Sequence, residues 1–191
     1  GTGALQELTT GEGNVAIGRA AMNVHGTGGY NIAIGNFAMD DTNAGSTSAG
    51  STHNIFIGND AGGGTWTDVA SNQNVAIGNY AMDSALDGAL YNTTVGYASL
   101  SSLTTGDYNV ALGSLALQTH TTGNRNIAIG YAAMNNTDAG STSLDSSDNV
   151  FIGYGAGSGT WTNTSIQYNV GIGSNVMDSA LDGALYNTAM G

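Results

Sequence analysis

One short pattern recurs along the whole chain: Asn, two variable residues, an aliphatic residue and Gly. It reads NVAIG at residue 14, NIAIG at 31, NVAIG at 74 and NIAIG at 126. The copies begin at Asn14, Asn31, Asn54, Asn74, Asn92, Asn109, Asn126, Asn149, Asn169 and Asn187. Regular repetition on this scale is typical of a solenoid, in which each repeat forms one coil that stacks on its neighbours.

A second, longer period lies over the first, so that residue n resembles residue n + 95. The segment MDSALDGALYNT occurs at 82–93 and again at 177–188, and GTW occurs at 64–66 and 159–161. The uneven spacing between Asn residues repeats with the same period. The sequence therefore predicts two five-coil units, residues 1–95 and 96–191, with the second a duplicate of the first and continuous with it.

The residues inside each copy favour strands over helices. A helical solenoid needs two amphipathic helices per repeat, or more than about 30 residues, and this chain has 31 Gly and no sustained helical spacing of apolar residues. In NVAIG, Val15 and Ile17 alternate with Ala16, which is the two-residue period of a strand. We therefore predict an all-β fold, a parallel β-solenoid or β-roll of about ten coils stacked about 4.8 Å apart.

Each recurring residue type suggests a structural role. Asn tolerates left-handed turn geometry, and its amide both donates and accepts, so stacked Asn side chains would form a ladder along one edge. Gly would end each strand where φ is positive or another backbone lies close. The predicted Gly corners are Gly18, Gly35, Gly58, Gly78, Gly96, Gly113, Gly130, Gly153 and Gly173. The strand aliphatics would fill a narrow core together with Met22, Met39, Met82, Leu100, Leu117, Met134 and Met177.

The middle residue of each predicted strand is usually small. It is alanine or glycine at Ala16, Ala33, Ala76, Ala111, Ala128 and Gly171. Because this residue points away from the aliphatic ones, we expect a smooth outer face suited to close packing against another chain. Phe56 and Phe151 interrupt the series and would fill a wider space on that face. The alternative, in which these alanines simply face solvent, stays open.

Composition excludes several kinds of partner. The formal net charge is −12, and Arg19 and Arg125 are the only lysine or arginine residues, too few to neutralise the phosphates of a nucleic acid. There is no Cys, which excludes disulfides, and no apolar run approaches the roughly 20 residues of a membrane helix. With neither an initiator Met nor a signal peptide at the N-terminus, we expect a segment of a longer protein.

The units NVAIGRAAM (14–22), NIAIGYAAM (126–134) and TTGDYNVALGSLAL (104–117) resemble the head repeats of YadA-type trimeric autotransporter adhesins and related repeats of bacteriophage tail fibres. The resemblance covers essentially the whole chain. It implies a left-handed parallel β-roll in each chain, three chains side by side as a homotrimer, and an extracellular place on a bacterial surface or in a virion tail fibre. It further implies attachment of the fibre to a host glycan or protein. The coils here are longer and less even than in that pattern.

Two other functions fit parts of the sequence. The chain could form a self-assembling extracellular filament without specific receptor binding. Residues 17–21 also fit one hexapeptide of the left-handed β-helix acyltransferases, but that pattern occurs only once per coil. Candidate catalytic side chains lie on polar loops that occur twice, which suits multivalent binding better than a unique active site. We predict no enzymatic activity, no catalytic residue and no cofactor.

The longer coils contain the remaining candidate contact residues. Trp66 and Trp161 occupy equivalent Gly/Thr-rich loops, where an exposed indole could stack on a sugar of a receptor glycan; alternatively each indole folds back to cover its own loop or a neighbouring chain. The acidic turns 83–88 and 178–183 lack the ligand spacing of a calcium loop, so we expect solvated turns and no metal site.

Overall fold

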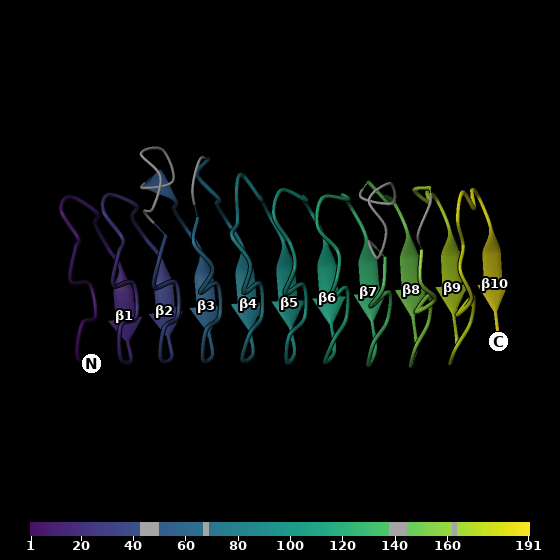
Figure 1. Cartoon of the computed structure of the whole chain (residues 1–191), viewed down its shortest axis with the longest axis horizontal. Helices are drawn as coiled ribbons and strands as arrows, with labels where there is room; N and C mark the ends of the chain where they lie inside the picture. Colours follow the sequence, from purple (N-terminus) through teal and green to yellow (C-terminus); the bar gives the residue numbers. More distant parts are fainter. Residues whose placement is uncertain (43–49, 67–68, 138–144, 162–163) are drawn as a thin grey trace.

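The computed structural model describes residues 1–42, 50–66, 69–137, 145–161 and 164–191, which form an all-β parallel solenoid. Within these residues ten three-residue strands lie side by side in chain order (Figure 1). They are β1 (Val15–Ile17), β2 (Ile32–Ile34), β3 (Ile55–Ile57), β4 (Val75–Ile77), β5 (Thr93–Val95), β6 (Val110–Leu112), β7 (Ile127–Ile129), β8 (Val150–Ile152), β9 (Val170–Ile172) and β10 (Thr188–Met190).

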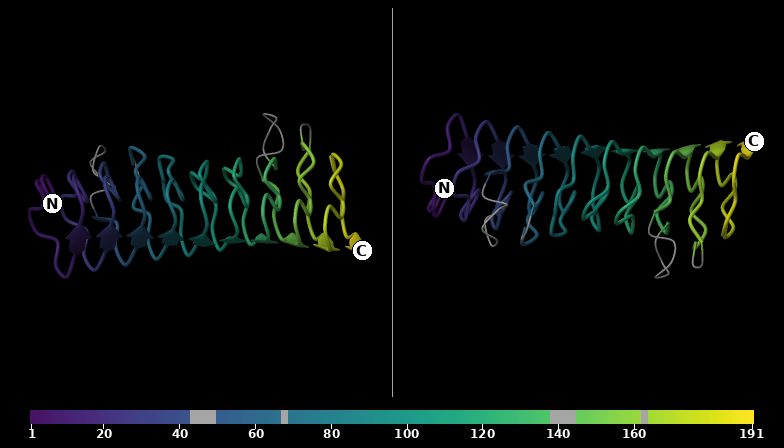
Figure 2. Two further views of the ribbon diagram at one scale, coloured as in Figure 1. Left: turned by 90° about the horizontal axis from the view of Figure 1, so that it is seen from below. Right: turned by 90° about the horizontal axis from the view of Figure 1, so that it is seen from above.

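Each strand pairs in parallel with the next strand along the chain, and equivalent residues face each other. Ala16 is opposite Ala33, and Ala33 is opposite Phe56. The pairing continues from β5 to β6, so the sheet crosses residue 95 without a break. Seen from two further sides, the strands line one side of the rod and the turns project from the other (Figure 2). The two ends of the chain lie at opposite ends of the rod.

The Gly corners have both properties expected of them. Gly18 has φ +140°, and the other eight predicted corners have φ between +133° and +152°. A Cβ atom added to Gly18 would lie 2.1 Å from the carbonyl oxygen of Gly35 on the next coil. Stacking at the corner thus brings backbone against backbone, and only glycine leaves room for it.

Three other places in each coil have left-handed backbone: the residue before the ladder Asn, the second residue after the corner Gly, and the core Met or Leu. Examples are Tyr30 (φ 59°), Ala20 (φ 54°) and Met22 (φ 50°). Left-handed backbone costs about 1–2 kcal/mol for a residue other than glycine. The backbone N–H groups of these three examples donate to an adjacent coil, as Met22 N does to Ala38 O at 2.9 Å. The ladder Asn residues themselves do not have left-handed backbone, although we expected Asn to take the left-handed turn position. The residue before each ladder Asn takes that position instead.

The prediction for the two sides of each strand was wrong. The middle residue points into the core: Ala33, Ala76, Ala111, Ala128, Phe56 and Phe151 are fully buried. The flanking aliphatics point outward, and Val15 and Ile17 are 42% and 57% exposed. A period of two shows that two sets of side chains face opposite ways, but not which set faces inward.

The opposite wall of the coil explains this choice. Met22, Met39, Met82, Leu100, Leu117 and Met134 are fully buried as predicted, and Met177 is partly buried against the same core. These long side chains come from the turn and fill the width of the coil. Little more than a methyl group then fits on the strand side, so the larger β-branched residues lie outside.

In two coils the large core residue lies on the strand and the small one lies on the opposite wall. Phe56 takes the place of the strand alanine, and Gly62 takes the place of the core methionine; Phe151 and Gly157 repeat the exchange. A Cβ atom on Gly62 would lie 2.6 Å from the Phe56 ring, so the large residue on one wall requires the absence of a side chain on the other. Phe56 and Phe151 therefore fill the inside of the coil and not its outer face.

Candidate functional site

The outward side chains of β1 to β10 form a continuous surface, which we call the apolar face. They are the first and third residue of every strand, and all are Val, Ile, Leu or Met except Thr93 and Thr188. The parallel register places each of these side chains directly beside its equivalents on the adjacent coils. The face therefore runs the length of the sheet with a repeat of about 4.8 Å.

Tyrosines border the apolar face on both sides. At the start of the strands they precede the ladder Asn, as at Tyr91 and Tyr108; at the end they follow the corner Gly, as at Tyr131 and Tyr154. Among the described residues, 18 large apolar or aromatic side chains are exposed, and all but Val69 and Leu185 belong to the apolar face or these borders. Exposed apolar surface is thus concentrated on one side of the rod.

The predicted Asn ladder is a continuous column of hydrogen bonds. Asn31 donates from its backbone N to Asn14 Oδ1 at 2.9 Å and from Nδ2 to the same oxygen at 3.1 Å. Nδ2 also donates to Ser51 O at 2.9 Å. The same two bonds to the preceding Asn link every later step, up to Asn187 and Asn169. Eight of the ten Asn residues are fully buried, so the ladder aligns the coils and is not a contact surface.

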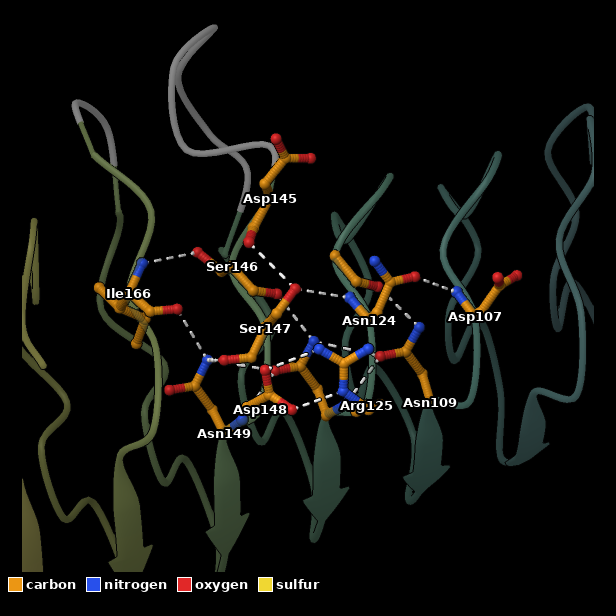
Figure 3. A network of polar contacts seen from close by, with 12 residues as sticks. Asp107, Asn109, Asn124, Arg125, Asp145, Ser146, Ser147, Asp148, Asn149 and Ile166 are labelled. Carbon is orange, nitrogen blue, oxygen red and sulfur yellow. Dashed lines mark hydrogen bonds and ion pairs between the residues drawn. The ribbon is translucent and has the colours of Figure 1, made fainter. Parts of the chain in front are cut away.

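A second polar ladder, which our sequence reasoning missed, runs beside the first one. Asp107 N donates to Asn124 Oδ1 at 2.7 Å, and Asn124 N donates to Ser147 Oγ at 2.8 Å (Figure 3). These residues stand two positions before the ladder Asn. Leu90 N continues the series by donating to Asp107 Oδ1 at 2.8 Å. The only sequence signal is a short polar residue at this position in several coils.

An exposed ion pair lies just outside this second ladder. Arg125 donates from Nε to Asp148 Oδ1 at 2.6 Å and from Nη2 to Oδ2 at 2.9 Å (Figure 3). The hydrogen bond from Arg125 holds the pKa of Asp148 below its usual value. Residues Tyr30 and His53, 95 positions earlier, stack in the same place with ring centroids 5.1 Å apart.

Trp66 and Trp161 are core residues. Both indoles are fully buried, contrary to the expectation that they stack on a receptor sugar. The Trp66 ring lies edge-on to Phe56 with centroids 5.8 Å apart, and Trp161 is tilted against Phe151 at 6.0 Å. The geometry fits the alternative in which each indole folds back beneath its own loop. We therefore assign no receptor contact to these two residues.

The equivalent histidines His25 and His120 are also buried inside their coils. His25 Nδ1 lies 2.6 Å from Thr42 Oγ1, and Nε2 lies 3.0 Å from Gly28 O. Burial lowers the pKa of His25 below its usual value. His120 has the matching neighbours Thr137 and Gly123, at 3.0 and 2.9 Å. Both rings join adjacent coils and are closed off from solvent.

Among the described residues of the first unit, three acidic side chains from successive coils lie close enough that repulsion between them raises the pKa of two. We call Asp40, Asp60 and Asp83, from three successive coils, the acidic column. Partial burial, followed by repulsion from Asp41 and Asp60, raises the pKa of Asp40 to about 6. Partial burial and repulsion from Asp60 and Asp40 raise the pKa of Asp83 to about 6 as well. The second unit has Asn135, Gly155 and Asp178 in these places.

The predicted acidic turn 83–88 is held within the fold. Asp87 Oδ1 accepts from Val69 N at 2.7 Å, and Gly88 N donates to Ser71 Oγ at 3.0 Å, so the turn is tied to the preceding coil. Across the described ranges, no group of three His, Asp or Glu residues is placed to hold a metal ion, and no pocket opens. In the same ranges there is no helix with the length and apolarity to cross a membrane.

The longest segments between copies of the Asn pattern include residues 43–49 and 138–144, which lie outside the described residues. Comparison of the chain with protein-family models, with curated proteins and with solved structures found no match.

Proposed function

We propose that this chain is a rod segment of a trimeric extracellular attachment fibre, built from left-handed β-rolls, of the kind found in bacterial adhesins and phage tail fibres. The observation that carries the proposal is the apolar face. A monomer seldom exposes a contiguous apolar patch of more than a few hundred Å². Here β-branched side chains line the sheet on every coil, bordered by exposed tyrosines. Each Å² of apolar surface removed from water contributes about 25 cal/mol.

The occupant of this face that fits best is another copy of the same chain. The outward side chains repeat at the coil spacing along the whole sheet. A partner that matches the face along its length needs the same repeat, and a second copy of the chain has it. The alanines that we first expected to form the contact are inside the coil, so the proposed interface uses the opposite side of each strand.

The two borders of the face favour a ring of copies about one axis. One border carries Tyr91, Tyr108 and Tyr168, whereas the other carries Tyr97, Tyr131 and Tyr154. If the first border of one copy meets the second border of the next, copies that point the same way along one axis close into a ring, and the resemblance of the repeats implies three members. In this arrangement the turns face outward, where loops that occur twice would bind a host glycan or protein with multivalent strength.

The test is the absolute mass of the purified chain in solution by light scattering. Three times the 19.1 kDa chain mass is expected. Replacing Ile77 and Leu112 by Asp, on the apolar face, should give a monomer with an unchanged circular dichroism spectrum. Val69→Asp is the matched control, because Val69 is 53% exposed but lies outside the face; it should remain trimeric. The trimer also predicts adhesion to host cells, which the double variant should lose.

Other masses would overturn the proposal. A wild-type monomer would leave the apolar face without its proposed role. Large, polydisperse assemblies would favour the alternative of a self-assembling filament. A double variant that keeps the trimer mass would place the interface elsewhere on the rod.

A further inference from the structure

Every tyrosine in the chain packs against an aromatic ring on an adjacent coil. The nine residues are Tyr30, Tyr80, Tyr91, Tyr97, Tyr108, Tyr131, Tyr154, Tyr168 and Tyr186. Tyr30 pairs with His53, and the other eight form four tyrosine pairs. None of the nine is buried, and their exposed fractions range from 39% to 75%. In the single chain the phenol groups are therefore both paired and accessible.

Three of the four tyrosine pairs have parallel rings. Tyr91 and Tyr108 have centroids 4.9 Å apart and planes 5° apart; Tyr168 and Tyr186 have 4.9 Å and 4°. Tyr131 and Tyr154 have 5.3 Å and 14°. In each pair the two side chains stand at equivalent positions of successive coils. The carbons ortho to the two hydroxyl groups therefore face their counterparts at about one coil spacing, near 4.8 Å.

The fourth pair provides an internal contrast. Tyr80 and Tyr97 meet edge to face, with planes 81° apart and centroids 5.8 Å apart. They do not stand at equivalent positions, since Tyr80 is the second residue after its corner Gly and Tyr97 is the first. The edge of one ring meets the face of the other, so the two rings do not present equivalent carbons to each other as the parallel pairs do.

We propose that the three parallel pairs, Tyr91–Tyr108, Tyr131–Tyr154 and Tyr168–Tyr186, are sites of oxidative cross-linking to dityrosine within the chain. The oxidant is of the haem peroxidase class, supplied with hydrogen peroxide. Composition makes tyrosine the residue suited to covalent reinforcement here: there is no Cys for a disulfide, and the two basic residues, Arg19 and Arg125, leave no lysine for an amide link. Both members of each pair belong to the same chain, so the link itself needs no second copy.

The chemistry balances for each link. The oxidised haem takes one electron and one proton from each of the two phenols, and hydrogen peroxide is reduced to two waters. The two phenoxyl radicals form one new carbon–carbon bond between their ortho carbons. Each of these carbons then gives its hydrogen, as a proton, to its own ring oxygen, which restores two phenols. Two tyrosines and one hydrogen peroxide thus yield one dityrosine and two waters.

Each link would tie one coil to the next. The two members of every pair stand on successive coils, so each link closes a loop of a single coil. Closing a loop restricts the unfolded chain, as a disulfide does. The cross-linked rod should therefore need a higher denaturant concentration to unfold, and each coil would resist being pulled from its neighbour.

The test oxidises the folded chain with a haem peroxidase and hydrogen peroxide at low protein concentration. Dityrosine fluorescence should appear in a band that stays at the chain mass on a denaturing gel. Proteolysis and tandem mass spectrometry should then identify the three linked peptide pairs. Tyr91→Phe keeps the ring stack but has no hydroxyl to oxidise, so it should remove only the Tyr91–Tyr108 link.

The matched variants distinguish cross-linking at the three parallel pairs from cross-linking at any exposed tyrosine. The triple variant Tyr91→Phe, Tyr131→Phe and Tyr168→Phe should lose nearly all the fluorescence, although Tyr80 and Tyr97 remain. Tyr80→Phe should leave the yield unchanged. The proposal is overturned if tyrosine is consumed without dityrosine, if Tyr80–Tyr97 links in comparable yield, or if the products run as dimers and larger species on the gel.

Discussion

The two five-coil units use equivalent positions differently inside and outside the rod. The largest interior rings recur from one unit to the other, as in the buried pairs Phe56 and Phe151, Trp66 and Trp161, and His25 and His120. Several outer side chains differ: Asp40, Asp60, Tyr30 and His53 become Asn135, Gly155, Arg125 and Asp148. The backbone is nevertheless unchanged, with φ 59° at Tyr30 and 56° at Arg125.

This contrast shows what a stacked coil requires of each residue. An inward side chain touches the coils before and after it, so its volume is constrained from both sides. An outward side chain needs only to accept the local backbone conformation. Substitutions of core residues should therefore change the free energy of unfolding most. Substitutions that replace a surface residue of one unit by its equivalent from the other unit should change it least.

The largest effect is expected where a coil redistributes its core volume. Phe56→Ala should lower the free energy of unfolding by about 3–5 kcal/mol, because it leaves a cavity beneath Trp66. Adding Gly62→Met should restore most of the loss. Alanine with methionine is the pair used by the adjacent coils, and Met39 and Met82 adopt φ 50° and 49°, close to the 63° of Gly62. Urea unfolding of both variants measures the difference.

Gly62→Met alone is the control for this exchange. With Phe56 retained, it should destabilise the chain by overpacking. The second unit sharpens the comparison, because Gly171 replaces the alanine found at Ala76, and a Cβ there would lie 2.6 Å from the Phe151 ring. Gly171→Ala should therefore be destabilising until Phe151→Ala and Gly157→Met are added. A double variant no more stable than Phe56→Ala would show that the two walls do not exchange volume.

The features that the sequence predicted well each depend on a chemical property that one residue type has and most others lack. Only glycine permits the corner at Gly18, and a side-chain amide that donates and accepts, as at Asn31, can form a ladder. A step of 17 to 23 residues has room for about two short strands and two turns, whereas within the described residues each coil has one named strand, of three residues. The strands, corners and ladder therefore followed from pattern alone.

Inside and outside could not be assigned in the same way. The two-residue period shows that Val15 and Ala16 point in opposite directions, but it does not show which one points inward. The side chains on the opposite wall of the coil determine which one is buried. One clue was present in the sequence: each strand phenylalanine is followed, at the place of the core methionine, by a glycine, as with Phe56 and Gly62. The tyrosine pairs emerge only once the coils are stacked, because Tyr91 and Tyr108 lie a full coil apart along the chain.

A middle-sized effect is expected at the acidic column, which only the first unit has. The raised pKa of Asp40 and Asp83, about 6, exceeds the ordinary 3.8, so the folded chain binds these two protons more tightly than the unfolded chain. Their contribution to stability is full below pH 3.8 and is lost as the pH rises through about 6. The variant Asp40→Asn with Asp83→Asn should therefore be more stable than wild type at pH 7, and the gap should close near pH 4.

Urea unfolding of both proteins between pH 4 and pH 7.5 measures that gap. His25 acts in the opposite direction in the same range, because burial lowers its pKa. Both proteins retain His25, so its contribution cancels in the difference. Glu7→Gln, at an exposed acid on the first coil, controls for the loss of charge alone. A gap that stays constant with pH would mean that the carboxyl groups of the acidic column do not titrate as proposed.

The smallest effect is expected where the two units place an ion pair and an aromatic stack at the same site. Arg125 is 58% exposed and Asp148 21%, and an ion pair so open to water is weak and screened by salt. Asp148→Ala should lower the urea midpoint slightly at low salt and hardly at all in 1 M NaCl. Lowering the pH through the depressed pKa of Asp148 should also remove the difference, since that carboxylate stabilises the fold only while ionised.

The matching experiment places the aromatic pair of the first unit, Tyr30 and His53, at the equivalent positions 125 and 148 of the second unit. Arg125→Tyr with Asp148→His should match wild type at high salt and lose the salt dependence, because a ring stack such as that of Tyr30 and His53 takes the place of the ion pair. A large loss that persists in 1 M NaCl would locate the energy elsewhere, in the neighbouring bond from Asn124 N to Ser147 Oγ. The surface of the rod would then be coupled to its second polar ladder, and outward residues would be less free to vary than the two units indicate.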